Sequence, residues 1–279
     1  MKLTLGFSPC PNDTFIFHGI VNNKVDTEGL EFEIFMADVE DLNRTAFEGK
    51  ASLLKLSYHA YAHASRDYII LDSGGAIGRG NGPLVISKRE MTLEDIDNST
   101  VAIPGIYTTA NLLFGMFRPG AVKRKVYLFS DIPDAVLNDE ADAGIIIHET
   151  RFTYREKGLR EVADLGMLWE NMTGLPVPLG TIAIHRKIPE DIALSVNRII
   201  KRSIGYARNN IRETYQFIRK HSQETSDEVI GRHIELYVNS FTESMGKEGR
   251  MAVSELFRRA AGAGVIPELP ERIFLQVNN

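Results

Sequence analysis

Residues 141–149 of this chain, Ala-Asp-Ala-Gly-Ile-Ile-Ile-His-Glu, contain an apolar run that ends on a histidine and a glutamate. Three consecutive β-branched residues predict a strand over residues 143–147 that is buried on both faces, as in sheets covered by helices. Such a strand delivers His148 to its carboxyl end, the edge where open α/β sheets place their ligands. A neutral imidazole suits a general base near pH 7, although a structural histidine would fit the same position. Glu149 is a weaker candidate base, because a carboxylate ionises readily unless it is buried.

On either side of this run the chain alternates short apolar stretches with amphipathic ones, which is the pattern of α/β layers. In the first 90 residues the pattern predicts strands over residues 3–7, 30–36, 52–56, 68–73 and 83–87, and helices over residues 12–21, 39–48 and 58–65. A second unit follows, with strands predicted over residues 100–103 and 125–129 and helices over residues 109–117 and 132–138. The sequence therefore favours an α/β fold of two successive units.

The chain changes character after residue 189. Helical spacing runs through residues 192–210, 211–220, 226–237 and 247–263, and short strands are expected only near Val238 and at the C-terminus. Residues 174–180, with two prolines and two glycines, predict a loop that leads into a strand over residues 181–185. We therefore expect two lobes with an interlobe cleft, the larger from residues 1–85 and 186–279, completed by the C-terminal helices, and the smaller from residues 86–185.

The composition is that of a soluble globular protein, since 43% of the 279 residues are hydrophobic, 25% are charged and the net charge is −5. No basic block supplies the concentrated positive charge that nucleic acid requires, so nucleic acid is not an expected partner. No stretch reaches the roughly 18 apolar residues of a membrane span, and the N-terminus lacks the pattern of an export signal. The single cysteine, Cys10, cannot close an intramolecular disulfide, which favours the reducing cytoplasm.

Two loops of similar design join a strand to a helix, one in each expected lobe. Residues 8–13, Ser-Pro-Cys-Pro-Asn-Asp, precede the first helix, where Ser8, Asn12 and Asp13 can cap the helix or meet a ligand. In the second loop, Thr108 and Thr109 offer hydroxyls and N–H groups at the start of another helix. Capping explains each loop alone, whereas two such loops facing one cleft favour ligand binding.

Lys55 ends the third expected strand, between two leucines and just before Ser57. A cation at this end of a sheet can meet an anionic ligand, and a lysine that reaches sideways into solvent is the alternative. His59 and His63 follow at a spacing that can bind a metal, but no third ligand is evident, so no metal is expected.

Two further features predict no chemistry. The glycine-rich residues 72–83 run into a strand and not into a helix, which excludes a nucleotide-binding loop and indicates a flexible connection beside the cleft. Cys10 has no basic partner nearby in the sequence, so we expect an inert thiol.

Several of these segments together resemble the 1,4-dihydroxy-6-naphthoate synthase family of the futalosine route to menaquinone. The likeness covers most of the chain in the same order, and its most specific blocks are Ser-Pro-Cys-Pro-Asn-Asp and Ile-His-Glu. It rests on residues 6–15, 55–57, 108–109, 144–149 and 174–180.

The resemblance implies a periplasmic-binding-protein-like fold of type 2, adapted from ligand capture to catalysis. It implies cleavage of cyclic dehypoxanthinylfutalosine to 1,4-dihydroxy-6-naphthoate and dihydroxyacetone, by a carbon–carbon lyase that uses no metal or organic cofactor. His148 corresponds to the family's proton acceptor. The substrate-binding segments of the family correspond to Lys55, Leu56, Ser57, Thr108 and Thr109, and we add Ser8, Asn12 and Asp13 from their position beside the cleft.

Two alternatives stand beside this interpretation. The first is chorismate dehydratase of the same pathway, which the Ile-His-Glu block makes less favoured. The second is a non-catalytic protein that binds small molecules, for which two lobes and a cleft are equally natural. The missing export signal argues against the second. The oligomeric state does not follow from the sequence, and a small-molecule substrate is the one partner expected.

Overall fold

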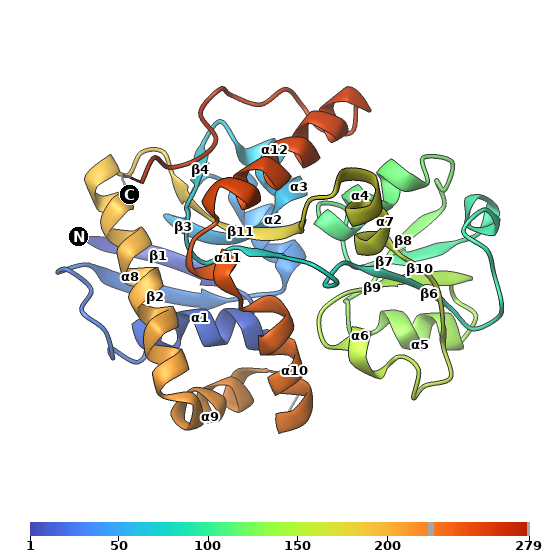
Figure 1. The fold of residues 1–279 in the computed structure, drawn as a ribbon, viewed down its shortest axis with the longest axis horizontal. Helices are drawn as coiled ribbons and strands as arrows, with labels where there is room; N and C mark the ends of the chain where they lie inside the picture. The colour runs from blue at the N-terminus through green and yellow to red at the C-terminus, as the bar shows by residue number, and fades with distance from the viewer. Residues whose placement is uncertain (223–225, 278–279) are drawn as a thin grey trace.

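Two β-sheets organise the chain in the computed structural model, which describes residues 1–222 and 226–277 (Figure 1). The first sheet contains β1 (Lys2–Phe7), β2 (Glu31–Met36), β3 (Leu53–Ser57), β4 (Tyr68–Ile70), β5 (Ala76–Gly78) and β11 (Val177–His185). Their order is β2-β1-β3-β11-β4, with β5 also paired to β11. Strands β1, β2 and β3 are parallel, and β11 is antiparallel to β3, β4 and β5. This sheet, with the helices packed on it, is the larger lobe.

The second sheet forms the smaller lobe together with the helices around it. Its strands are β6 (Leu84–Ser87), β7 (Val101–Ile103), β8 (Arg124–Val126), β9 (Ala143–Ile146) and β10 (Arg160–Asp164), in the order β10-β6-β9-β7-β8. All four residues of β9 are buried, as the run of β-branched residues predicts. Because β9 lies in the middle of the sheet, its carboxyl end carries His148 to the edge of this lobe.

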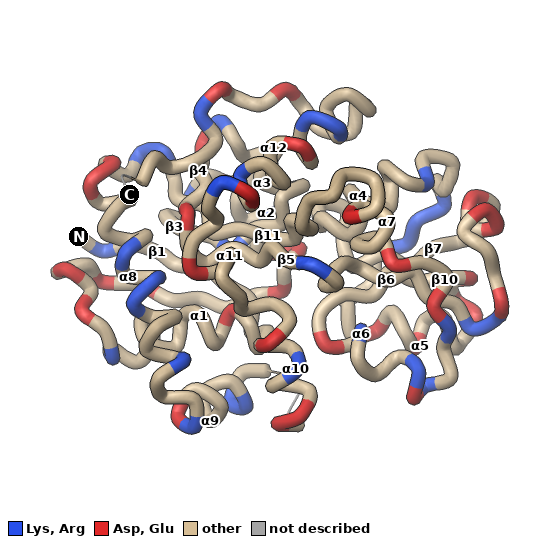
Figure 2. The backbone as a smooth tube through the Cα atoms, viewed as in Figure 1, with Lys and Arg blue, Asp and Glu red and all other residues tan. Residues whose placement is uncertain are grey.

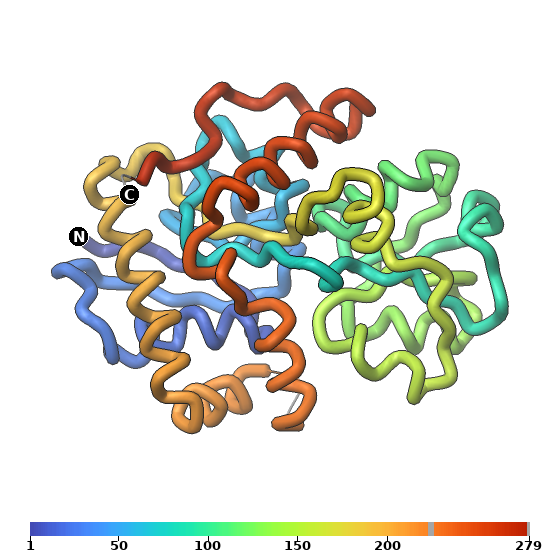
Figure 3. Tube along the Cα trace, viewed as in Figure 1, coloured from blue at the N-terminus to red at the C-terminus, as the bar shows by residue number. Residues whose placement is uncertain are grey.

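Helices cover both sheets. The larger lobe has α1 (Pro11–Val21), α2 (Val39–Phe47), α3 (Tyr58–Ala64), α8 (Glu190–Asn209), α9 (Ile211–His221), α10 (Asp227–Tyr237), α11 (Ser240–Glu243) and α12 (Gly246–Gly262). The smaller lobe has a 3-10 turn (Asp95–Asn98), α4 (Thr109–Phe117), α5 (Ile132–Leu137), α6 (Thr150–Thr153) and α7 (Leu165–Thr173). Helices α8, α9 and α10 pack on α1, and α12 packs on β11. The C-terminal helices thus lie on the larger lobe, as the orange and red segments of Figure 3 show.

The chain crosses between the two sheets twice, from β5 to β6 and from α7 to β11. At the first crossing Gly82 lies against Gly166 at the start of α7, where a Cβ on Gly82 would approach the Gly166 Cα to 2.3 Å. Strand pairing places β6 wholly in the smaller lobe and β11 wholly in the larger one. The predicted lobe limits at residues 85/86 and 185/186 stay a prediction.

Several local predictions were wrong. Residues 177–180 were predicted as a loop but form the beginning of β11. A proline cannot donate a hydrogen bond to the neighbouring strand, and the register of β11 against β5 shifts between Pro178 and Gly180, which accommodates it. The glycine-rich residues 72–83 contain the buried strand β5 and are not simply a flexible connection. Val238 follows α10 and lies in no strand. The sequence patterns also missed β10 and α7, since no element was predicted between residues 148 and 173.

Charged residues of both signs are interspersed over both lobes, without a basic face in the view of Figure 2. Among the described residues, no helix is both long enough and apolar enough to cross a membrane.

Candidate active site

A cavity lies between the two lobes and contains about 670 Å³ of empty space, open solvent at its mouth included. The larger lobe contributes the loop before α1, the end of β3 and Tyr237 of α10, and the smaller lobe contributes the start of α4 and the end of β9. All nine predicted site residues line it: Ser8, Asn12, Asp13, Lys55, Leu56, Ser57, Thr108, Thr109 and His148. Other lining residues were not among the predicted site residues, although the first three lie in the segment expected beside the cleft: Asn81, Gly82, Pro83, Leu179, Gly180 and Tyr237.

Lys55 and Asp13 form a buried ion pair at the floor of this cavity. The Lys55 Nζ lies 2.8 Å from the Asp13 Oδ1, and the two side chains are 7% and 2% exposed. Lys55 also donates to the Gly74 carbonyl oxygen at 3.2 Å, so these bonds use two of its three donors. The alternative of a lysine that reaches into solvent was wrong. An anionic ligand that contacts Lys55 would therefore meet an ion pair and not an isolated positive charge.

Asp13 also fixes the loop before α1. Its Oδ2 accepts from the Ser8 hydroxyl at 2.8 Å and from the Ser8 N–H at 3.2 Å, while its Oδ1 accepts from the Asn12 amide at 2.8 Å. The helix begins after Cys10 without a side-chain cap, so the expectation that Asp13 caps it was wrong. Its carboxylate instead lies in the first turn, where the positive end of the helix dipole stabilises it.

The three hydroxyls near the start of α3 and α4 already have hydrogen-bond partners. Thr108 Oγ1 caps α4 by accepting from the Asn111 N–H at 3.2 Å. Thr109 Oγ1 accepts from the Tyr58 N–H at 2.9 Å and donates to the Leu179 carbonyl at 2.6 Å, so it ties the smaller lobe to the larger one. Ser57 Oγ accepts from the Asn43 amide at 3.2 Å.

His148 follows β9 and is half-buried at the cavity wall. Its backbone φ is +56°, a left-handed conformation that is uncommon outside glycine. The Phe129 ring packs edge-on against the imidazole with centroids 5.0 Å apart. Burial lowers the pKa of His148 to about 4, against the opposing pull of the Asp13 carboxylate. At neutral pH the ring is therefore uncharged and can accept a proton.

A second histidine, His233 of α10, lies behind the cavity wall and was not predicted. Its ring is parallel to that of His148, with centroids 6.1 Å apart, and its Nε2 lies 3.0 Å from the Asn12 Oδ1. Because the Asn12 amide nitrogen donates to Asp13, this Oδ1 must act as the acceptor, so neutral His233 carries its proton on Nε2. The bare Nδ1 then lies 3.8 Å from the Glu149 Oε2 and has no hydrogen-bond partner among the described residues. No sequence signal links a histidine on this distant amphipathic helix to the site.

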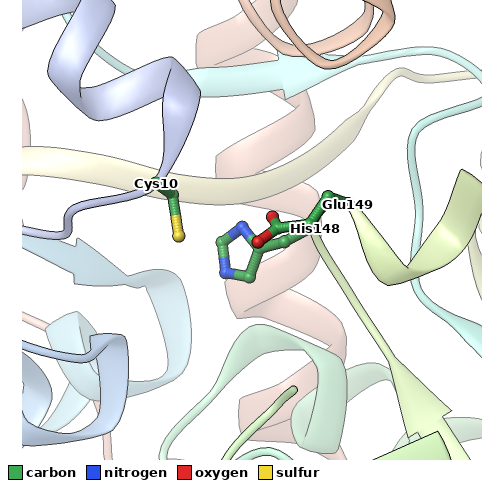
Figure 4. Close-up of side chains that lie close together, drawn as sticks. All are labelled: Cys10, His148 and Glu149. Atoms are coloured by element: carbon green, nitrogen blue, oxygen red, sulfur yellow. The ribbon is translucent and has the colours of Figure 1, made fainter. Parts of the chain in front are cut away.

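Cys10, His148 and Glu149 come together across the cavity wall. One candidate ligand atom of each lies within 4.8 Å of the others, and Figure 4 shows the three side chains turned toward one another. Burial, followed by the Glu149 carboxylate, raises the pKa of the Cys10 thiol well above its usual value. This supports the expectation of a thiol that is not ionised at neutral pH. Cys10 has no histidine nearby in the sequence, but the fold brings His148 close to it from the other lobe.

His59 and His63, the other pair considered for metal binding, lie on α3 with ring centroids 5.4 Å apart. Burial lowers the pKa of His59 to about 4. Neither lines the cavity, and no third ligand joins them among the described residues.

Comparison with known proteins gives a consistent result. Residues 3–262 match the sequence model of a family described as menaquinone biosynthesis. A relative from Thermus thermophilus, named 1,4-dihydroxy-6-naphthoate synthase, is 44% identical over 98% of this chain and 99% of its own length. A relative of the same name from Streptomyces coelicolor is 37% identical over 96% of this chain and 95% of its own length.

Solved structures show the same architecture. A protein from Archaeoglobus fulgidus superposes with a TM-score of 0.90 at 35% identity, over 95% of this chain and 98% of that one. A Candida albicans protein described as having the generic periplasmic binding protein fold superposes with a TM-score of 0.72 at 11% identity, over 100% and 99% of the two chains. The predicted two-lobed fold of the periplasmic-binding-protein kind is confirmed.

Proposed function

The chain belongs to the menaquinone biosynthesis family, and we propose that it is a 1,4-dihydroxy-6-naphthoate synthase with His148 as its general base. Its substrate would be cyclic dehypoxanthinylfutalosine, and its products 1,4-dihydroxy-6-naphthoate and dihydroxyacetone. The observation that carries the proposal is the placement of His148, neutral and half-buried, at the wall of a cavity lined by all the other predicted site residues.

The reaction breaks a carbon–carbon bond in a ring that bears several hydroxyls. It needs a base that removes a proton from a hydroxyl or an acidic C–H, and a place for the electrons released. Aromatisation of the product supplies that place, so the chemistry we propose for this lyase needs no metal or organic cofactor. A positioned general base contributes roughly 10²–10⁴-fold to such a step.

His148 has the electrostatic surroundings of a proton acceptor. Burial keeps it neutral before the reaction, and the nearby Asp13 carboxylate favours the imidazolium that forms when it takes a proton. Lys55 opposes this, and its charge and that of Asp13 partly cancel because the two form a 2.8 Å ion pair. The pair thus offers Lys55 to the substrate without leaving a net positive charge beside His148.

The substrate would be held from both lobes. We assign the remaining Lys55 donor and the Ser57 hydroxyl to one end of it, and the first-turn N–H groups of α4, next to Thr108 and Thr109, to hydroxyls or a carboxylate at the other. Thr109 bonds groups of the larger lobe and so helps to hold the two lobes together. Lobes closed over the substrate would orient it and exclude water. We place this reaction in the cytoplasm, with the small-molecule substrate as partner.

Turnover of the cyclic substrate by the purified protein tests the proposal, with the naphthoate product followed by absorbance and mass. We expect His148→Ala to lower kcat at least about a hundredfold with KM little changed, because the base acts in the transition state. His63→Ala is the matched control, an exposed histidine outside the cavity. Near-normal turnover by His148→Ala would assign the base elsewhere. Substrate binding by the wild type without turnover would indicate a non-catalytic binding protein.

A further inference from the structure

We propose that the cavity wall also binds Zn²⁺, through the Cys10 thiolate, a ring nitrogen of His148 and a carboxylate oxygen of Glu149, and that the bound ion inhibits the enzyme. The three candidate ligand atoms lie within 4.8 Å of one another. In Figure 4 the thiol faces the imidazole and the carboxylate from the opposite side of the gap. Cys10 and Glu149 are 5% and 8% exposed, so two of the three ligands are sheltered from water.

The three residue types are those that zinc prefers. Zinc bonds of about 2.0–2.3 Å to sulfur, nitrogen and oxygen place neighbouring tetrahedral ligands roughly 3.2–3.8 Å apart, so two ligands at the 4.8 Å limit must approach by about 1.0–1.6 Å. A set of one sulfur, one nitrogen and one oxygen leaves the fourth position to water, as in open zinc sites. Mg²⁺ and Ca²⁺ are disfavoured because they require a shell of oxygen ligands.

The charges around the three proposed ligands favour the binding of a cation. The Glu149 carboxylate lies close to the Cys10 thiol, and its negative charge attracts a metal ion. The charge of Lys55 is offset by Asp13, so it does not dominate the site. Behind Glu149, the Nδ1 of His233 is wholly buried, has no hydrogen-bond partner among the described residues and lies 3.8 Å from the carboxylate. A lone pair that faces a carboxylate repels it, and a cation bound to Glu149 would offset that repulsion.

The ligands come from both lobes. Cys10 precedes α1 of the larger lobe, whereas His148 and Glu149 follow β9 of the smaller lobe. A metal ion bound by all three therefore fastens the lobes together and occupies the imidazole. Inhibition rests on the proposed function, in which His148 must be free to accept a proton, but binding does not.

Cobalt provides a direct test of binding, because Co²⁺ bonded to a thiolate gives a near-ultraviolet charge-transfer band. Cys10 is the only cysteine in the chain, so such a band reports this site alone. We expect the wild type to develop the band, to saturate with one equivalent of Co²⁺ and to lose the band when Zn²⁺ is added. A wild-type protein without the band under these conditions would overturn the proposal.

Calorimetric titration with Zn²⁺ measures the contribution of the thiolate. Loss of outer-sphere support weakens metal sites by about 10–100-fold, so we expect Cys10→Ala, which removes a ligand, to weaken binding at least about tenfold. His221→Ala, which removes an exposed histidine at the end of α9, should leave the affinity unchanged. Equal zinc affinity in the wild type and Cys10→Ala would contradict the assignment.

Activity separates this proposal from the proposed function. We expect Zn²⁺ to inhibit the wild type, and Cys10→Ala to keep its turnover while needing at least about ten times more Zn²⁺ for the same inhibition. A cobalt band in a wild-type protein that never turns over the substrate would support the metal site and contradict the enzyme. Turnover without any cobalt band would do the reverse.

Discussion

The loop before α1 and the loop before α4 face the same cavity, yet they are held in different ways. Residues 8–13 are fixed inside the larger lobe by Asp13, which bonds Ser8 and Asn12 and pairs with Lys55. Residues 104–108 depend on the other lobe, because Glu40 of α2 accepts from the Ile106 N–H at 3.1 Å and from the Tyr107 N–H at 3.2 Å.

The crossing contact is close. Gly105 has a φ of +155°, and a Cβ there would lie 2.5 Å from the Glu40 carboxylate, so the absence of a side chain lets the two lobes meet. The bonds of the first loop lie within one lobe, so we expect this loop to keep its shape if the lobes separate. The second loop would then lose its Glu40 partner.

Breaking the first loop should have the largest effect on stability. Asp13→Ala leaves the Lys55 ammonium buried without its partner, and removing one member of a buried ion pair costs about 3–5 kcal/mol. Urea unfolding of the purified variant measures this loss. The double variant Asp13→Ala/Lys55→Met should recover part of it, since no buried charge remains. A loss below about 1 kcal/mol in Asp13→Ala would mean that the pair is not a stabilising element.

The second largest effect should be a loss of stability in acid, which arises beside the second loop. His59 lies beside it, with its ring centroid 5.9 Å from that of Tyr107, and burial lowers its pKa to about 4. Since the unfolded residue titrates near 6.5, the unfolded chain binds more protons between these values, and stability falls as the pH drops through that window. Between pH 7 and pH 5 this one histidine should cost about 2 kcal/mol.

Unfolding free energies at the two pH values, in the wild type and in His59→Gln, measure that contribution. Glutamine keeps a donor but does not titrate, so the variant should lose about 2 kcal/mol less over the same interval. His63→Gln, on the same helix and exposed, is the control. Parallel losses in the wild type and His59→Gln would refute this origin of acid sensitivity.

A smaller effect is expected where α2 meets the second loop. Glu40→Ala removes the acceptor of two N–H groups and so destabilises the closed arrangement, which should raise KM about tenfold. kcat should change little, because Glu40 does not line the cavity. Steady-state kinetics decide this, with Glu40→Gln, which keeps an acceptor oxygen, expected to lie nearer the wild type. An unchanged KM in Glu40→Ala would show that these bonds do not govern closure.

The smallest effect belongs to the cap of α4. Thr108→Ala removes the acceptor of the Asn111 N–H and should lower the unfolding free energy by about 1 kcal/mol. Thr108→Ser keeps the hydroxyl and should retain most of the stability. Urea unfolding compares the two variants. A loss in Thr108→Ala as large as that of Asp13→Ala would remove the distinction drawn between the loops.

The sequence predicted those parts of the fold and site that depend on local pattern. The apolar run before His148 and the spacing around Lys55 point to the carboxyl ends of strands, and both residues line the cavity. His233 and the approach of Cys10 to Glu149 depend on how segments more than a hundred residues apart pack, which no local pattern records. The beginning of β11 was missed because its prolines favour loops unless a register shift accommodates them.

The left-handed backbone of His148 has a consequence for how the chain could vary. A non-glycine residue in that conformation costs roughly 1–2 kcal/mol, so the fold is less stable at this position than it would be with glycine. Only glycine would remove that cost, because the penalty comes from the Cβ atom. Glycine carries no imidazole, so the strain falls on the one residue to which we assign the general base.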